Sequence, residues 1–268
     1  MVIKIKDTAG FSGFINDNID RSDYRYKYLI NVLDLIYSQE IEVNENSFVD
    51  TEDDSWIIFV EIEGQLFIYG LNYSELLITR FIKAIDLNEY EGFEIMGTRD
   101  LVYQILQQSQ IHNYKVIKDR CFYQLSDYTA VPQNKDFTFP IKNDLDELVL
   151  MFQSYYVEEY NGERNKSANI LTPMITELIQ NDEIYVYKNG DTILAFCSII
   201  NPDIGIVFTR HEHRNHGIGR RLLEYCSSLL FDKNEIAYLM TDMHNSASNK
   251  ICKKIGYELI YEHTNLKL

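Results

Sequence analysis

The stretch Arg210–Leu223, RHEHRNHGIGRRLL, decides how this chain is interpreted. A strand-like run, Ile204–Thr209 (IGIVFT), precedes it, and a run with helical apolar spacing, Ile218–Phe231 (IGRRLLEYCSSLLF), follows. The pattern predicts a strand, a bend that contains glycine, and a helix. A helix N-terminus has N–H groups without partners and a partial positive charge, so such a bend suits an anion.

The residues around the bend favour a phosphate. Gly217 and Gly219 have no Cβ, so a large anion could approach the main chain there. A pyrophosphate with a further phosphate nearby would match the charge of the surrounding basic residues, which are Arg210, Arg214, Arg220 and Arg221 and, on the next predicted helix, Lys250, Lys253 and Lys254. The alternative is a solvated helix start with surface arginines, because a short glycine motif alone is weak evidence.

Composition limits the classes of protein that need to be considered. The chain has 268 residues, of which 46% are hydrophobic, with only 12 glycines and 4 prolines, as expected for a folded globular protein. The formal net charge of -16 argues against a nucleic-acid binder, which needs a basic face. The acidic surplus either keeps the protein in solution or attracts a cationic substrate.

Sequence features that indicate a location are few. The first residues have no apolar core of signal-peptide length, and no run approaches the roughly 20 apolar residues of a membrane helix. The cysteines are far apart and form no CxxC pair, which argues against a disulfide framework and a structural zinc site. We therefore expect a reduced cytoplasmic protein without a membrane segment.

The stretch Val131–Pro140 (VPQNKDFTFP) is the best candidate for a linker, since it contains two of the four prolines. It predicts an N-terminal domain over residues 1–130 and a C-terminal domain over residues 135–268. In the first domain, apolar spacing and β-branched or aromatic runs predict helices at 24–39, 74–85 and 99–110 and strands at 56–62, 65–71 and 93–97.

The C-terminal domain has a clearer order of elements. Pro173 is tolerated in the first turn of the second predicted helix, and Asn189-Gly190 favours a type I′ hairpin turn. The predicted elements are helices at 144–160 and 172–180, a hairpin over 183–200, a strand at 204–209, a helix from 218, a strand at 237–243, a helix at 246–255 and a strand at 257–268. Both domains thus alternate strands with helices, which indicates an α/β or α+β fold.

Two motifs in this order resemble a known family. Arg214–Gly219 (RNHGIG) fits Q/R-x-x-G-x-G/A, the hallmark of the GCN5-related N-acetyltransferases (GNAT superfamily), between a strand and a helix. Downstream, Asn245–Tyr257 (NSASNKICKKIGY) is similar to a second family element, an asparagine followed by a helix that ends in Gly-aromatic. The resemblance covers about half of the chain and implies a mixed, mostly antiparallel central sheet flanked by helices.

The resemblance also implies a ligand, acetyl-CoA or another acyl-CoA. Its pantetheine would pair with the backbone of β-strand residues near the bend, and an N–H there would stabilise the oxyanion formed when an amine attacks the thioester. The residues that the family pattern assigns to the cofactor are Val207, Phe208, Thr209, Arg214, Asn215, His216, Gly217, Ile218, Gly219, Arg220 and Asn245.

The activity implied is N-acetyl transfer (EC 2.3.1.-) to a primary amine of a small molecule or peptide. It proceeds by direct attack in a ternary complex, so that no covalent enzyme intermediate is needed. The acidic composition weakly favours polyamines, aminoglycosides or basic peptide termini as acceptors.

The catalytic positions depart from the family pattern. Many relatives have a tyrosine acid where this chain has Cys252, which is either a weaker acid or a small core residue. Some relatives have a glutamate base where this chain has Met240. Asp203 falls where histone-type relatives have their glutamate and is our candidate base, the alternative being a turn residue after a proline. Asp242 and Glu159 are further options.

Other side chains near the motif admit a second interpretation. His211, His213 and His216 suggest a metal, but no separate ligand cluster completes a site, so we predict none. The tyrosines of the helix at 144–160 either pack in the core or line the acceptor pocket, which this helix often borders in the family.

The N-terminal domain has no R/Q-x-x-G-x-G motif, and its end, GFEIMGTRDLVYQIL, resembles a strand and helix of a degenerate acetyltransferase half. We expect the tandem arrangement found in some family members, with an unrelated regulatory domain as the alternative. A catalytically silent acyl-CoA-binding module remains the second hypothesis for the chain's function. Exposed sheet edges in this fold often pair, which leaves a homodimer open.

Overall fold

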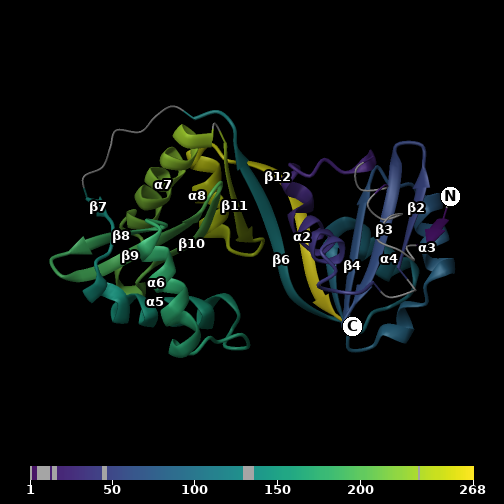
Figure 1. Cartoon of the computed structure of the whole chain (residues 1–268), viewed down its shortest axis with the longest axis horizontal. Coiled ribbons are helices and arrows are strands. Elements are labelled where there is room, and N and C mark those ends of the chain that lie inside the picture. The colour runs from purple at the N-terminus through teal and green to yellow at the C-terminus, as the bar shows by residue number, and fades with distance from the viewer. Residues whose placement is uncertain (1, 5–12, 14–16, 44–46, 129–135, 235) are drawn as a thin grey trace. The chain divides into compact units, whose positions relative to one another are not determined.

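The computed structural model describes residues 2–4, 13, 17–43, 47–128, 136–234 and 236–268. The chain forms two compact units. Unit 1 comprises Met1–Phe122, Thr241–Ser246 and Ile260–Leu268, and unit 2 comprises Tyr123–Met240 and Ala247–Leu259. Figure 1 labels most of the elements of both units. The predicted linker at 131–140 lies partly outside the described residues, and its second half contains a short strand, β7 (Phe137–Thr138).

Strands of unit 1 follow the order β1-β2-β3-β4-β5-β12-β6. Neighbours from β1 to β4 are antiparallel, β4 and β5 are parallel, and β12 is antiparallel to β5. The strands are β1 (Val2–Lys4), β2 (Phe48–Glu52), β3 (Ser55–Ile62), β4 (Gln65–Leu71), β5 (Glu94–Thr98), β6 (Lys115–Leu125) and β12 (Glu258–Lys267). The helices are η1 (Tyr24–Tyr26), α2 (Lys27–Tyr37), α3 (Glu75–Ala84), η2 (Leu87–Tyr90) and α4 (Arg99–Gln108).

Side-chain alternation along β3 explains the layers of unit 1. Ile57 and Phe59 join a buried cluster with α3 and α4, whereas Ile58 and Val60 join a second buried cluster with α2. Successive side chains of a strand point to opposite faces. The sheet is therefore covered by α2 on one face and by α3 and α4 on the other, which explains why β3 reads as a continuous apolar run.

Unit 2 has strand order β11-β10-β9-β8-β7, in which β7 to β10 are antiparallel and β10 is parallel to β11. Its further strands are β8 (Ile184–Asn189), β9 (Thr192–Ile200), β10 (Asp203–Thr209) and β11 (Ala237–Asp242). Its helices are η3 (Lys142–Asp144), α5 (Leu145–Glu159), α6 (Ala168–Gln180), η4 (His211–His213), α7 (Ile218–Asn234) and α8 (Ser246–Ile255). The predicted mixed, mostly antiparallel sheet flanked by helices is confirmed.

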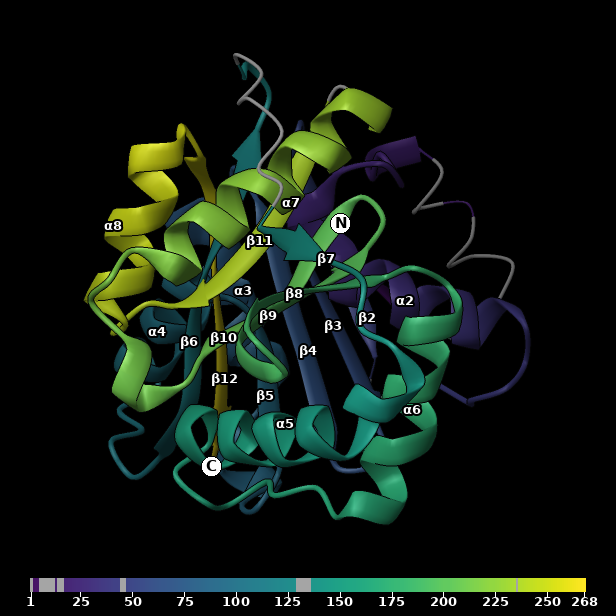
Figure 2. The same ribbon diagram turned by 90° about the vertical axis from the view of Figure 1, so that its left-hand side faces the viewer.

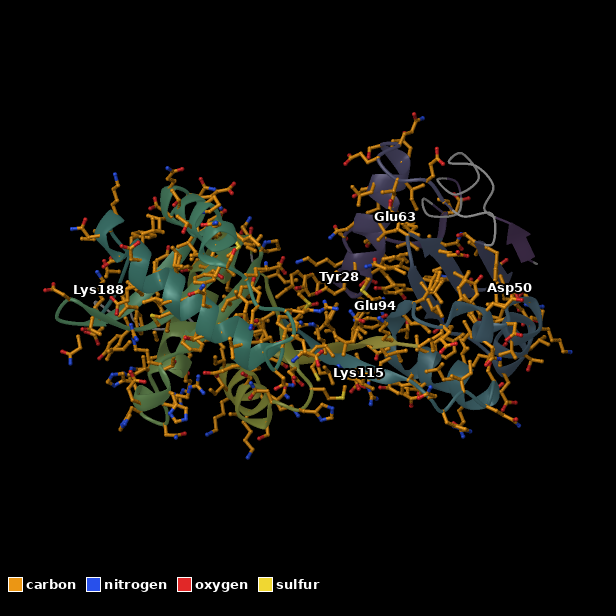
Figure 3. All side chains as sticks on the ribbon, turned by 90° about the horizontal axis from the view of Figure 1, so that it is seen from below. Tyr28, Asp50, Glu63, Glu94, Lys115 and Lys188 are labelled. Atoms are coloured by element: carbon orange, nitrogen blue, oxygen red, sulfur yellow. The ribbon has the colours of Figure 1, made fainter. Side chains whose placement is uncertain are left out.

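Helices lie on both faces of the sheet in unit 2, with α7 on one side of β8, β9 and β10 and with α5 and α6 on the other (Figures 1 and 2). On the α5 side, the Phe152 ring stacks on Phe196 of β9 with centroids 4.3 Å apart. On the α7 side, Tyr185 of β8 contacts Tyr225, with centroids 5.6 Å apart. Lys188, labelled in Figure 3, donates from β8 to both carboxylate oxygens of Asp144 at 2.8 and 2.6 Å, which ties the sheet to the start of α5.

Two local predictions about unit 2 were wrong. The hairpin loop consists of Gly190 and Asp191, because Asn189 pairs with Thr192. Only Gly190 has a positive φ, +61°, which fits a type II′ turn and not the predicted type I′. Helix α6 begins at Ala168, so Pro173 lies inside it and not in the first turn.

In the described part of the chain, none of the helices combines the length and apolar composition that crossing a membrane requires.

Candidate functional site

Strand β10 separates from β11 as it approaches the glycine bend. Among the described residues the two strands pair only at Asp203 and Tyr238, whereas β10 stays paired with β9 as far as Thr209. The N–H of Arg210 donates to the carbonyl of Leu194 on β9 at 2.9 Å. Because N–H directions alternate along a strand, those of Thr209 and Val207 point away from β9, toward the open edge.

The bend after β10 contains two left-handed residues, Asn215 (φ +65°) and Gly217 (φ +72°). The first bond of α7 runs from the N–H of Arg221 to the carbonyl of Gly217 at 3.1 Å. Glycine has no side chain to cap the first turn. Within the described residues, the N–H groups of residues 215–220 make no intramolecular hydrogen bond. Left-handed turns and uncapped helix starts together form a binding surface for anions.

The two glycines of the motif are required for different reasons. Position 217 requires glycine because of its left-handed backbone, φ +72°, which other residues rarely adopt. Lack of space is not the reason, because a Cβ there would meet only the Arg221 Nη1 atom, at 3.4 Å. At Gly219 a Cβ would lie 2.8 Å from the Oγ1 atom of Thr209, which is closer than real Cβ contacts allow. Gly219 thus lets the start of α7 lie against the end of β10.

Two arginines of the basic cluster brace the bend. Arg210 donates to the carbonyl of Ile193 at 2.6 Å and to Glu147 of α5 at 2.5 Å. Arg214, the first residue of the motif, donates from Nε to the carbonyl of Thr209 at 3.0 Å and from Nη2 to Glu158 at 2.7 Å. These bonds fix both ends of the segment between β10 and the helix.

The other two arginines, Arg220 and Arg221, lie in the first turn of α7. Arg220 pairs with Glu224 one turn later at 2.8 Å, and Arg221 donates to the carbonyl of His216 at 3.3 Å. Three of the four arginines that the sequence suggested for phosphate binding therefore pair with carboxylates. Backbone N–H groups and the N-terminus of α7 add partial positive charge at the bend.

Sequence reasoning missed Glu147 and Glu158, the carboxylates that hold Arg210 and Arg214. They lie 63 and 56 residues from their partners along the chain, so no local pattern connects them. Only the observation that α5 and the bend belong to one unit could have suggested the pairs.

The end of α5 presents tyrosine rings next to these carboxylates. Tyr156 stacks on Tyr160 with centroids 6.1 Å apart, and Tyr155 contacts Tyr156 edge to face. The ammonium group of Lys166 lies 4.5 Å from the centroid of the Tyr156 ring. Tyr155 and Tyr156 also pack against the buried cluster that contains Phe208 of β10.

The remaining predicted site residues are distributed as follows. Asp203 is buried at the start of β10, where the two strands still pair. Cys252 is 1% exposed on α8 of unit 2. Asn245 is exposed in the turn after β11, in the Thr241–Ser246 segment of unit 1, and its N–H donates to the carbonyl of Asp242 at 3.0 Å. Asp203 and Cys252 are thus enclosed, whereas the bend, the end of β10 and Asn245 are accessible.

Asp242, the alternative base, is bound by Lys118. Burial of Asp242 favours its neutral form, but the hydrogen bonds from Lys118 Nζ at 2.7 Å and from the N–H of His244 prevail and lower its pKa. A carboxylate with a lowered pKa is a weaker base.

His211 and His213 belong to a short 3-10 helix, and His216 follows in the bend. Among the described residues, no three His, Cys, Asp or Glu side chains gather in a way that could hold a metal ion.

Unit 1 repeats the strand–helix–strand pattern with β4, α3 and β5, but without a glycine bend. Only residues 72–74 connect β4 to α3, and the Ser74 hydroxyl accepts the N–H of Leu77 at 3.2 Å. This helix start is capped by the protein itself, in contrast to that of α7.

Residues 180–259 of the chain match the family model described as the acetyltransferase (GNAT) domain. No curated protein matches the chain.

Two solved structures with a similar fold are a GCN5-related N-acetyltransferase from Sphaerobacter thermophilus and an acetyltransferase of the GNAT family from Colwellia psychrerythraea. The first has 12% identity and a TM-score of 0.59 and covers 100% of this chain and 95% of its own. The second has 14% identity and a TM-score of 0.59 and covers 100% and 98%. At these identities the likeness concerns the fold, and it extends over both units. Together with the family-model match it confirms the resemblance found in the sequence: the C-terminal part of this chain carries a GNAT acetyltransferase domain.

Proposed function

We propose that unit 2 transfers an acetyl group from acetyl-CoA to a primary amine of a small molecule or peptide. The observation that carries this proposal is the set of uncapped N–H groups at residues 215–220, next to the open edge of β10. A diphosphate and an extended amide chain are the two chemical features of coenzyme A that such a surface would bind.

The bend would hold the diphosphate through main-chain N–H groups. Gly217 and Gly219 leave the main chain accessible, and the start of α7 adds a partial positive charge. Arg214 would act mainly by fixing the bend against Glu158, since its guanidinium is already engaged. Arg221, which among the described residues pairs with no carboxylate and donates to the carbonyl of His216 at 3.3 Å, is the arginine best able to turn toward a phosphate.

The open edge of β10 would hold the pantetheine. Its amides would pair with the strand where Val207 and Thr209 direct their N–H groups outward. When bound, acetyl-CoA supplies a thioester whose carbonyl oxygen becomes negative as an amine attacks. An N–H of Val207 or Thr209 that faces this oxygen would stabilise the charge.

The acceptor would be an amine that arrives as an ammonium ion. The net charge of -16 favours polyamines, aminoglycosides or basic peptide termini over acidic acceptors.

A base must remove a proton from the ammonium. Asp203 stays our candidate, and it lies four residues before Val207, about 13 Å along an extended strand, so it would act through water. Cys252 stays the candidate acid for the leaving thiolate. Its exposed fraction of 1% favours the alternative, a packing role in the core.

The test is release of coenzyme A from acetyl-CoA over a panel of amines, followed with a thiol reagent. We expect turnover with at least one polyamine or basic peptide. Asp203→Asn should lower kcat and shift the acidic limb of the pH profile if Asp203 is the base. Cys252→Ala should leave kcat within about twofold if the thiol only packs.

A second function, acyl-CoA binding without catalysis, is favoured by one observation. The position that holds a tyrosine acid in many relatives is a buried thiol here. Binding of acetyl-CoA without turnover on any amine of the panel would support this second function and contradict the first.

A further inference from the structure

Strand β10 contains a bulge opposite Ser198 of β9. Ile204 pairs with Ile199 and Val207 pairs with Cys197, so Gly205 and Ile206 together lie opposite Ser198. Two residues against one is the definition of a β-bulge, and it shifts the register of all later residues by one.

This shift decides which N–H groups face the open edge. Without the bulge, Ile206 would pair with Cys197, and the N–H groups of Val207 and Thr209 would turn toward β9. With it, Arg210 donates to Leu194 and the N–H groups of Val207 and Thr209 face outward.

Two side chains at the bulge are matched to each other. The Ser198 hydroxyl, on a residue that is 3% exposed, accepts the N–H of Ile206 at 2.7 Å. It thereby replaces the ladder bond that the bulge removes. A Cβ on Gly205 would lie 2.5 Å from this Oγ atom and 3.3 Å from the Ser198 carbonyl oxygen. Residue 205 must therefore be glycine as long as residue 198 carries a hydroxyl.

We propose that Ser198 and Gly205 are positioning residues, which hold the bulge so that the N–H of Val207 faces the acyl carbonyl oxygen. This inference rests on the proposed function. Neither residue needs to touch the substrate, and both act through the backbone of β10. The diphosphate would be held at residues 215–220, beyond the bulge, so the pair should affect the chemical step more than binding.

The first test compares Ser198→Ala with Ser228→Ala. Ser228 is a matched control, a buried serine of the same unit whose hydroxyl donates to the carbonyl of Tyr225 at 2.7 Å. Loss of one oxyanion donor lowers kcat by about 10²–10³-fold, so a misdirected donor should lower kcat about tenfold or more. We expect this for Ser198→Ala, with the KM for acetyl-CoA within about twofold, and an unchanged kcat for Ser228→Ala. Equal kcat values for the two variants would overturn the proposal.

The second test is a double-mutant cycle. Gly205→Ala in the wild-type background should lower kcat and the melting temperature, because its methyl group meets the Ser198 hydroxyl. In the Ser198→Ala background the contact of 2.5 Å with Oγ is missing and the contact of 3.3 Å with the carbonyl oxygen of residue 198 remains, so the same substitution should have a much smaller further effect. Additive effects would show that the two residues are not a matched pair.

The third test needs no activity. In ligand-free protein, hydrogen exchange by NMR should be faster at the outward N–H of Val207 than at the N–H of Phe208, and Ser198→Ala should reduce this difference while Ser228→Ala preserves it. If Ser198→Ala leaves the difference intact, the positioning role is wrong. If the difference falls as expected but the wild type acetylates no amine, the proposed function fails and the positioning of the strand edge is upheld.

Discussion

Replacement of Gly217 with alanine should have two separate effects, a loss of stability from backbone strain and a loss of affinity for acetyl-CoA. Gly217 has φ +72°, and alanine in the left-handed region costs roughly 1–2 kcal/mol. Space is not the obstacle, since the added Cβ would meet only the flexible end of Arg221 at 3.4 Å. At about 2–4 °C per kcal/mol for a domain of this size, the melting temperature of the ligand-free protein should fall by roughly 2–8 °C.

Gly190→Ala is the matched control. Gly190 has φ +61° in the β8–β9 turn, and a Cβ there would have nothing within 4 Å. It should cause a similar fall in melting temperature without any effect on the bend. Differential scanning calorimetry of both variants measures this comparison.

Of the two variants, only Gly217→Ala should weaken the binding of acetyl-CoA. If the bend relaxes to a negative φ, one or two N–H groups no longer point at the diphosphate, and hydrogen bonds to charged groups contribute about 1.5–3 kcal/mol each. The dissociation constant measured by isothermal titration calorimetry should rise at least about tenfold, since 1.4 kcal/mol corresponds to a factor of ten. The reasoning is refuted if both alanine variants lose the same stability and bind acetyl-CoA equally well.

Three further predictions concern other parts of the chain. Gly219→Ala should weaken acetyl-CoA binding in calorimetry. Adding Thr209→Ala to this variant should restore most of the affinity, because the second substitution removes the Oγ1 atom that the new Cβ would meet at 2.8 Å. If the affinity is not restored, the steric argument is contradicted. Arg214→Lys should raise the dissociation constant for acetyl-CoA about 3–10-fold with little change in melting temperature. One ammonium group cannot bind both Glu158 and the main-chain carbonyl of Thr209 as the guanidinium does. An unchanged affinity would show that these two bonds are not needed for binding. Burial, with a smaller contribution from a nearby arginine, lowers the pKa of His263 from 6.5 to about 3. Below about pH 6.5 the unfolded chain therefore binds one proton more than the folded chain. The free energy of unfolding then falls by about 1.4 kcal/mol for each unit by which the pH is lowered. Urea unfolding between pH 7 and 5 should show this slope in the wild type and a smaller one in His263→Gln, and equal slopes would contradict the assignment.

His263 lies in unit 1 within an aromatic cluster of the α2 face. Its Nε2 atom is 3.0 Å from the Tyr69 hydroxyl, and Tyr28, labelled in Figure 3, has its ring centroid 5.1 Å from that of the imidazole. Such packing explains why a charge on this imidazole is strongly disfavoured.

Local signals in the sequence predicted most of unit 2. The strand, glycine bend and helix from Ile204 onward are where the sequence indicated, because glycine spacing and apolar periodicity act over a few residues. The prediction failed at the hairpin turn, where the strand register, set across the whole β8–β9 pair, determines which residues form the loop.

Strands β1, β2, β6 and β7 were not predicted. Strand β6 contains the buried charged residues Lys118 and Asp119, which hide its apolar pattern. Asp119 accepts hydrogen bonds from Arg99 at 3.0 Å and from Thr264 at 2.7 Å, and Lys118 binds Asp242. These partners lie 20 to 145 residues away along the chain, so a local pattern could not reveal why charged residues are tolerated in that strand.

The same limit applies to the candidate site. The motif indicated which N–H groups are available, but not that Glu147 and Glu158 neutralise Arg210 and Arg214. Nor did it indicate the bulge opposite Ser198, since a bulge arises from the pairing of two strands and neither strand encodes it alone.

The most direct test of the central claim is the response of two glycine amides to acetyl-CoA. Selective ¹⁵N-glycine labelling of the 12 glycines yields a simple spectrum, in which Gly217→Ala and Gly219→Ala identify the two resonances of the bend. We predict that saturating acetyl-CoA shifts both of these resonances and slows their hydrogen exchange, while those of Gly64 and Gly92 in unit 1 stay in place. Binding of acetyl-CoA that leaves both bend resonances unmoved would contradict the account, as would an absence of binding.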